Sequence, residues 1–273
     1  MSKKIIITLA ALSCALILSQ AGFASESAQP VPAAAPQSSM TVSAAAIQPV
    51  VITDNRYQGT TVNISLPYSK DSSFQKIQDF FSSNVARSLY AHLPYYTDEY
   101  GQINPFYLKN GYTFEEIKDI ATISDFIHKR MNREAEARQE FSNRYDMVAD
   151  YDVTLNNSDY LSLLQSVYTY SGGAHGLTIR YSMTMDRATG RTVQLNDLFA
   201  DKNYLSVLNS HIDDQNTDIH FFQKVRLSGN EEFYLTDKGL TVYFQVYEVA
   251  PYAAGFIEYF FPYDTIAPFM YKK

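Results

Sequence analysis

The sequence predicts an α+β fold, in which an antiparallel sheet packs with helices in two sub-domains after a signal peptide and a disordered tether. Between Phe74 and about residue 135, apolar residues recur mainly every three or four positions, whereas from Tyr145 they recur at every second position. Helices followed by a run of strands are typical of α+β folds, not of alternating βαβ units. This grouping predicts sub-domains at 53–150 and 151–273, of which the second is the antiparallel one.

The first 24 residues have the features of a signal peptide. Lys3 and Lys4 precede an apolar stretch from Ile5 to Leu18, and Gly22-Phe23-Ala24 predicts cleavage after Ala24. A membrane-spanning helix needs about 20 apolar residues, so we expect no transmembrane span in the mature chain. An uncleaved anchor is the alternative. The single cysteine lies inside this segment, so the mature chain has none and depends on an apolar core.

Residues 25–52 are predicted to form a disordered tether. They are rich in Ala, Pro, Ser and Gln and carry no charge after Glu26. Such a segment buries too little apolar surface to offset the entropy of ordering its chain.

The elements of the folded part follow from periodicity. Alternation over Thr60–Leu66 predicts a strand. Asp71-Ser72 predicts a helix start, with apolar residues at helical spacing as far as Leu89. A capping box at Thr113 and Glu116 predicts a further helix, which continues to about Ala135.

The second sub-domain is predicted to contain several strands and one helical layer. Strands are expected at 151–155, 161–170 and 177–185, and a helical layer at 195–212. A strand–turn–strand is expected around Thr236–Gly239. The last strand, at 256–263, should lie at a sheet edge because it contains Pro262.

The charge of the chain restricts its partners. Lys and Arg number 22 against 29 Asp and Glu, a net charge of −7, and loss of Lys3 and Lys4 would make the mature chain more acidic. This balance argues against nucleic acid and against an anionic membrane surface. It favours a cationic partner, or serves solubility alone.

Several stretches in the second half resemble a known pair of domains. They are, in chain order, Tyr168-Thr-Tyr-Ser-Gly-Gly-Ala-His-Gly176, Asp186–Gly190, Leu195-Asn-Asp-Leu-Phe199, Phe233-Tyr-Leu-Thr-Asp-Lys-Gly-Leu240, Tyr247-Glu-Val-Ala-Pro-Tyr-Ala-Ala-Gly255 and Pro262-Tyr263. Their order and spacing resemble the paired domains of unknown function in the extracytoplasmic part of RsiV-type anti-sigma factors. The same pair is similar to the N-terminal part of PdaC-type peptidoglycan deacetylases. The resemblance covers about residues 55–268 and is strongest after 150.

The resemblance implies an α+β fold and a place in the bacterial cell envelope. In the RsiV type it implies binding of lysozyme, a cationic wall hydrolase. About three residues precede the apolar segment, and the chain ends at Lys273. We therefore expect a free-standing secreted module, without the cytoplasmic domain of an anti-sigma factor or the catalytic domain of a deacetylase.

Two loops contain the candidate ligand-binding residues. The first holds Gly172, Gly173, His175 and Gly176, and the second holds Tyr252 and Gly255. Glycines let a backbone approach a ligand closely, and loop tyrosines make good interface anchors. The alternatives are a purely structural role for the His175 loop and a tyrosine that caps the core.

The first loop also raises the question of catalysis. A hydrolase would use Ser171 as nucleophile and His175 as base. That spacing lacks a strand–nucleophile–helix context and a Gly-x-Ser-x-Gly motif, so we expect no catalytic residues.

The sequence gives little indication of a metal-binding or cofactor-binding motif. No histidine stands in a His-x-x-x-His pair, and we expect neither a metal nor a cofactor. Asp213, Asp214, Asp218 and His220 could touch a cation, but a solvated helix end is the preferred interpretation.

Together these patterns predict a secreted cell-envelope binding or sensing module without catalysis. Its partner would be a cationic wall-associated protein such as lysozyme. The alternative is an enzyme or binding module that acts on peptidoglycan or another carbohydrate through the His175 and Tyr252 loops.

Overall fold

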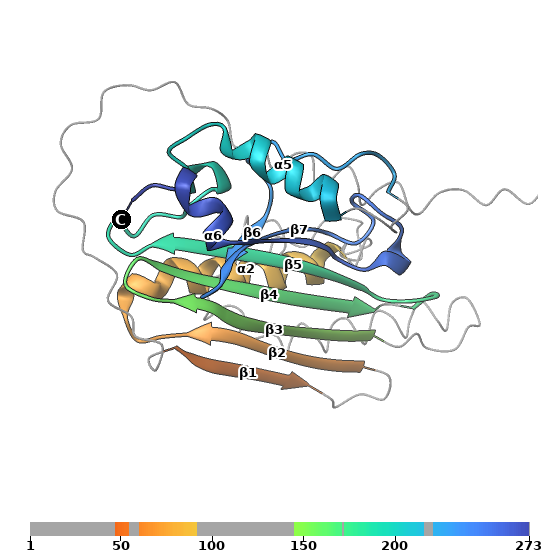
Figure 1. Ribbon diagram of the computed structural model, residues 1–273. Coiled ribbons are helices and arrows are strands. Elements are labelled where there is room, and N and C mark those ends of the chain that lie inside the picture. Colours follow the sequence, from red (N-terminus) through yellow and green to blue (C-terminus); the bar gives the residue numbers. More distant parts are fainter. Residues whose placement is uncertain (1–46, 55–59, 92–144, 171, 216–220, 273) are drawn as a thin grey trace, which may run out of the picture. The chain divides into compact units, whose positions relative to one another are not determined.

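The computed structural model describes residues 47–54, 60–91, 145–170, 172–215 and 221–272 (Figure 1). All of them belong to one compact unit, residues 38–273. The signal peptide, most of the tether and the helix expected at 113–135 lie outside the described residues. None of the described helices is long and apolar enough to cross a membrane.

The first sheet has five strands that follow one another in chain order. They are β1 (Gln48–Asp54), β2 (Thr60–Tyr68), β3 (Tyr145–Asn156), β4 (Tyr160–Tyr170) and β5 (Leu177–Asp186). Neighbouring strands run antiparallel except β2 and β3, which are parallel. The predicted α+β class is confirmed, with this parallel pair as an exception to the antiparallel pattern.

Two sequence-based boundaries fall inside strands of this sheet. Residues 48–52, assigned to the tether, form most of β1, because Val50, Val51 and Ile52 are β-branched and pair with β2. Residue 150, the expected sub-domain boundary, lies within β3. The chain leaves the first sheet only after Asp186 and enters the second at Phe233.

One face of the first sheet packs against α2 (Gln75–Ala91), which follows the short helix η2 (Ser72–Phe74). The predicted cap is present, since the Asp71 carboxylate accepts the Ser73 N–H at 2.9 Å. The core between helix and sheet includes Val62, Ile64, Leu66, Phe74, Ile77, Phe81, Val85, Met147 and Leu163.

A β-bulge lets the first sheet contribute to a second core. The register of β3 against β4 shifts between Val153 and Leu155. Before the shift, Met147 and Ala149 face α2, whereas Leu155 packs in the second hydrophobic cluster. The extra residue thus turns the end of β3 toward the other face of the sheet.

The second sheet has three antiparallel strands, in the order β6 (Phe233–Leu235), β7 (Gly239–Phe244) and β8 (Ile257–Pro262). The strand β8 ends at the edge of this sheet, as Pro262 predicts. The helix α5 (Tyr204–Gln215) packs against β8 (Figure 1). Short helices complete this part, namely η4 (Leu195–Leu198), η5 (Tyr252–Ala254), α6 (Tyr263–Ile266) and η6 (Ala267–Phe269).

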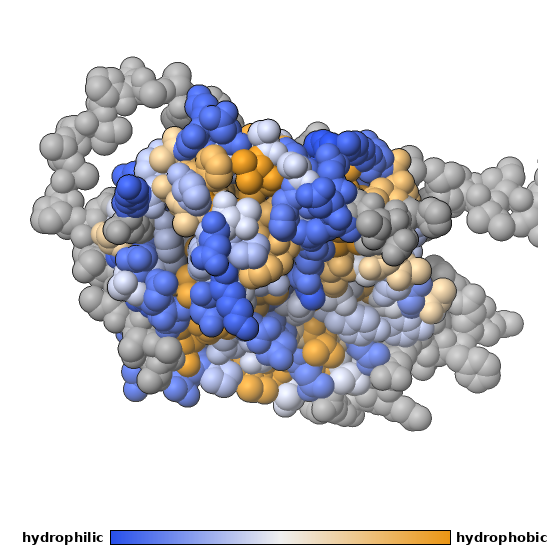
Figure 2. All heavy atoms as spheres, viewed as in Figure 1, coloured by the Kyte–Doolittle hydropathy of each residue, from blue (hydrophilic) through white to orange (hydrophobic). Residues whose placement is uncertain are grey.

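The surface is mainly polar. On the face shown in Figure 2, hydrophilic residues predominate and hydrophobic residues form separate patches between them. Among the described residues, Phe222 and Tyr247 are exposed aromatic side chains next to the second candidate loop.

Candidate functional site

The two loops that the sequence singles out meet in space. The β4–β5 loop carries His175 and the β7–β8 loop carries Tyr252, and both loops lie at the right-hand end of Figure 1. The rings of His175 and Tyr252 stack with their centroids 4.1 Å apart and their planes inclined by 20°. The structure therefore joins residues that are 77 positions apart in the chain.

Hydrogen bonds fix this pair of rings. The carbonyl oxygen of Gly176 accepts the Tyr252 hydroxyl at 3.1 Å and lies 2.8 Å from His175 Nδ1. Because a carbonyl can only accept, Nδ1 carries the proton and Nε2 of the neutral ring is an acceptor. The Tyr247 hydroxyl lies 3.4 Å from that Nε2 and is placed to donate to it.

Tyr247 belongs to the same group, although the sequence analysis did not single out its side chain. Its ring centroid lies 5.3 Å from that of Tyr252 and 6.5 Å from that of His175, and all three planes are within about 33° of one another. We call His175, Tyr247 and Tyr252 the ring cluster. Tyr247 is 51% exposed, whereas Tyr252 is partly buried.

Most of the predicted glycines shape the loops. A Cβ on Gly176 would overlap the Tyr168 ring, so only glycine lets this ring lie against the backbone. Gly172, Gly173 and Gly255 have positive φ angles of 99°, 95° and 71°. The carbonyl of Gly173 also accepts the Tyr170 hydroxyl at 3.0 Å. These contacts favour a conformational role for the glycines.

Arg180, Glu248 and Glu258 lie a few positions beyond the residues of the ring cluster in the chain. The Arg180 guanidinium is paired with Glu258 at 2.6 Å and lies 4.1 Å from the centre of the Phe256 ring. Glu248 follows Tyr247 directly and accepts the Gln245 N–H at 2.7 Å. Burial raises the pKa of Glu248, and nearby Glu231 adds to the effect.

The contacts of His175 bear on the hydrolase alternative. Within the described part of the chain, its polar partners are the Gly176 carbonyl and the Tyr247 hydroxyl. A general base of a triad would instead face a nucleophile and a carboxylate. Ser171, the nucleophile considered for this loop, lies outside the described residues.

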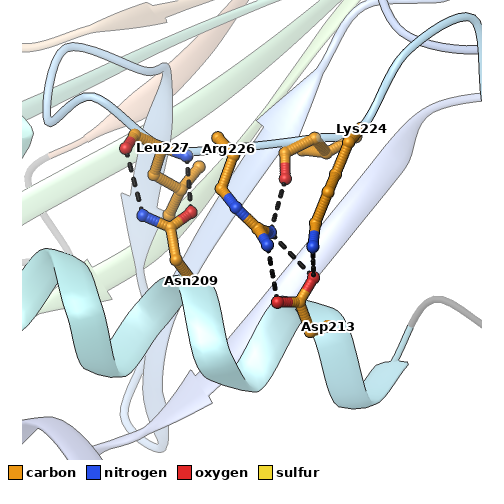
Figure 3. A network of polar contacts seen from close by, with 6 residues as sticks. Asn209, Asp213, Lys224, Arg226 and Leu227 are labelled. Atoms are coloured by element: carbon orange, nitrogen blue, oxygen red, sulfur yellow. Dashed lines mark hydrogen bonds and ion pairs between the residues drawn. The ribbon is translucent and has the colours of Figure 1, made fainter.

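Asp213, one of the four residues of the candidate cation site, is paired with the protein's own cations (Figure 3). Asp213 on α5 binds both Nη atoms of Arg226, at 2.8 and 2.6 Å, and Lys224 at 3.2 Å. The hydrogen bond from Arg226 contributes most to lowering the pKa of Asp213. Asp218 and His220 lie outside the described residues, and within the described ones no group of three or more His, Cys, Asp or Glu could hold a metal ion.

Comparisons with known proteins agree with the resemblance. Residues 54–178 match the family model described as "Deacetylase PdaC". Residues 196–264 match the model described as "Protein of unknown function (DUF3298)". A search of curated proteins finds no match.

Solved structures give the same result for the fold. A DUF3298 family member from Bacteroides fragilis is 18% identical, covers 83% of this chain and 93% of its own, and has a TM-score of 0.54. A DUF3298 family protein from Pseudomonas aeruginosa PAO1 is 15% identical, with coverages of 82% and 93% and a TM-score of 0.50. At these identities the likeness concerns the fold alone. The two matches lie in the same order along the chain as the pair of domains that its sequence resembles.

Proposed function

We propose that this protein is an extracytoplasmic binding or sensing module of the cell envelope, which acts by surface recognition and without catalysis. The observation that carries the proposal is the ring cluster. Three rings from two loops lie together with their planes within about 33° of one another, and their polar atoms bond mainly to one another and to the Gly176 carbonyl. Such an arrangement is suited to contact rather than to proton transfer.

Physical principles support a contact role for these side chains. Tyrosine supplies a large rigid area at a low cost in side-chain entropy, and it is enriched at interface hot spots. The His175–Tyr252 stack and the shared Gly176 carbonyl hold two rings before a partner arrives. Preorganised groups lose less entropy on binding.

The proposed partner is a cationic wall hydrolase such as lysozyme. The net charge of −7 supports this choice, because opposite charges accelerate encounter and favour one class of partner. Glu248 follows Tyr247 directly in the chain and supplies a carboxylate there. Attraction of this kind weakens as salt screens exposed charges.

Titration calorimetry of the purified chain with lysozyme tests the proposal. We expect saturable binding at low salt that weakens, but persists, at moderate salt. The variant Tyr271→Ala should bind lysozyme like the native chain, since Tyr271 is 58% exposed near the C-terminus and lies outside the ring cluster. An absence of binding at both salt concentrations would rule out lysozyme as the partner.

A carbohydrate ligand is the second candidate, because an exposed tyrosine ring beside the His175–Tyr252 stack also suits the flat face of a sugar. Incubation of the chain with peptidoglycan, followed by fragment analysis, tests whether the chain acts on this polymer as an enzyme. Wall fragments released by the native chain but not by His175→Ala, with the fold intact, would favour the enzyme.

Recovery of the chain in the cytoplasmic fraction of the producing cell would contradict the proposed location.

A further inference from the structure

We infer that Tyr247 is the residue of the ring cluster that contacts a cationic side chain of the partner. The strained backbone of its turn holds the ring in the position for this contact. This inference rests on the proposed binding function. It adds a residue that the sequence did not indicate, and it names the chemical group that the residue would bind.

The strain is visible in the turn Gln245–Glu248. The Glu248 N–H donates to the Gln245 carbonyl at 3.1 Å, and the Gln245 N–H donates to the Glu248 carboxylate at 2.7 Å. Tyr247 occupies the third position of this turn with φ at 69°. A turn with positive φ at that position normally takes glycine or asparagine.

The rest of the described chain follows that preference. Its other positive φ angles belong to glycines, and Tyr247 is the one described residue of another type with such an angle. Backbone strain in a non-glycine residue persists where the surroundings enforce it, commonly at functional sites. Packing gives a weak reason to keep tyrosine here, because the side chain is 51% exposed.

The position of the ring points to its ligand. Tyr247 is farther from His175 than Tyr252 is, so it forms the outer end of the ring cluster. An aromatic face attracts a guanidinium or an ammonium group. Elsewhere in the same protein, Phe256 holds Arg180 in this way, and Arg180 is further paired with Glu258. The Glu248 carboxylate beside Tyr247 adds attraction for a second cation, from the partner.

The experiment compares three variants of the full chain. Tyr247→Gly removes the ring and relieves the turn, Tyr247→Phe keeps the ring face without the hydroxyl, and Tyr271→Gly removes an exposed tyrosine elsewhere. Binding is measured with lysozyme and, separately, with an octa-arginine peptide at moderate salt. Thermal unfolding of each variant is measured in parallel.

We expect Tyr247→Gly to weaken binding of the octa-arginine peptide by about fivefold, while Tyr247→Phe and Tyr271→Gly bind like the native chain. We also expect Tyr247→Gly to unfold within about 2 °C of the native chain or above it, because relief of the turn offsets the lost ring contacts. Unchanged peptide binding by Tyr247→Gly would overturn the inference, and so would a clearly lower melting temperature.

The two probes separate this inference from the proposed function. If the native chain binds lysozyme and Tyr247→Gly binds it equally well, the function stands and the role of Tyr247 is refuted. If the native chain does not bind lysozyme, that partner is refuted, and the peptide comparison still decides whether Tyr247 holds a cation.

Discussion

Gly239 and Gly176 both lie where a side chain would overlap a neighbour, but the two neighbours differ in kind. A Cβ on Gly239 would meet the carbonyl oxygen of Phe261 in the paired strand β8. A Cβ on Gly176 would meet the outer end of the Tyr168 ring, which can rotate away. The space available at each glycine therefore predicts different costs of substitution.

We expect Gly239→Ala to lower the free energy of unfolding by about 3 kcal/mol, because a backbone atom of a paired strand cannot move aside. Gly176→Ala should cost about 1 kcal/mol, the price of shifting one partly buried ring. Urea unfolding of the two variants under one set of conditions gives the comparison. Equal losses would show that the sheet adjusts as easily as the Tyr168 ring.

The residues of the ring cluster show how far the sequence predicts a site. His175 and Tyr252 stood out because glycines and a proline mark their loops. Their stacking was not predicted, since it depends on how β5 and β8 are placed. Tyr247 gave no local signal, because a left-handed tyrosine is unexpected from residue preferences and becomes visible only as a φ angle.

At the scale of the elements, two amide side chains each bond both backbone groups of one distant residue, as a paired strand would. Gln245 accepts the Arg180 N–H at 3.0 Å and donates to the Arg180 carbonyl at 2.7 Å, along the outer edge of β5. Asn209 on α5 makes the same pair of bonds with Leu227, at 2.8 and 3.2 Å (Figure 3). The Gln245 amide satisfies backbone groups that a further strand beside β5 would otherwise bond, whereas Leu227 lies outside the strands.

The Gln245 pairing can be tested with an isosteric change. Gln245→Glu keeps the acceptor for the Arg180 N–H but replaces the donor with an oxygen that faces the Arg180 carbonyl. We expect a loss of about 1–3 kcal/mol in the free energy of unfolding near neutral pH, because a partly buried carbonyl loses its partner.

Chemical unfolding of Gln245→Glu and of a control, Gln223→Glu, provides the measurement. Gln223 is exposed and carries no comparable pair of bonds in the described structure. If both variants lose the same small amount, the edge of β5 does not depend on the amide of Gln245.

Periodicity predicted most strands of the described part but not their partners. The strand at Thr60 and the helix after Asp71 follow from local alternation and capping. The strand β1 was assigned to the tether because Pro49 and the preceding alanines suggested disorder. The parallel pairing of β2 with β3 joins segments about 80 residues apart, and no local pattern records such a pairing.

At the scale of the molecule, polar contacts join the two sheets. The Leu235 N–H in β6 donates to Ser162 Oγ in β4 at 3.0 Å, and Ser162 bonds Thr184 in β5 at 2.8 Å. Beside them, Glu232 accepts the Ser182 hydroxyl at 3.2 Å and the Tyr243 hydroxyl at 3.5 Å. The sheets therefore pack through satisfied polar groups as well as apolar ones.

Glu232 is the carboxylate through which we expect this junction to respond to pH. Part of its side chain is exposed, yet dense packing around the carboxylate raises its pKa, and Glu248 adds to the effect. Hydrogen bonds from Ser182 and Tyr243 oppose the rise. Between the ordinary pKa of a glutamate and the raised value, the native state holds more protons than the unfolded state, so stability falls as pH increases across that window.

Glu232→Gln should remove the part of this pH dependence that belongs to Glu232. Relative to the native chain, we expect the variant to gain stability as pH rises from about 4.3 through the raised pKa, and then to keep a constant advantage. Ser182→Ala should extend the window to higher pH, because it removes a hydrogen bond that favours the carboxylate. Urea unfolding at closely spaced values between about pH 4 and about pH 8 measures both effects. A difference between Glu232→Gln and the native chain that stays constant over this range would mean that Glu232 ionises equally in the folded and unfolded states, and that the junction between the sheets does not sense pH through it.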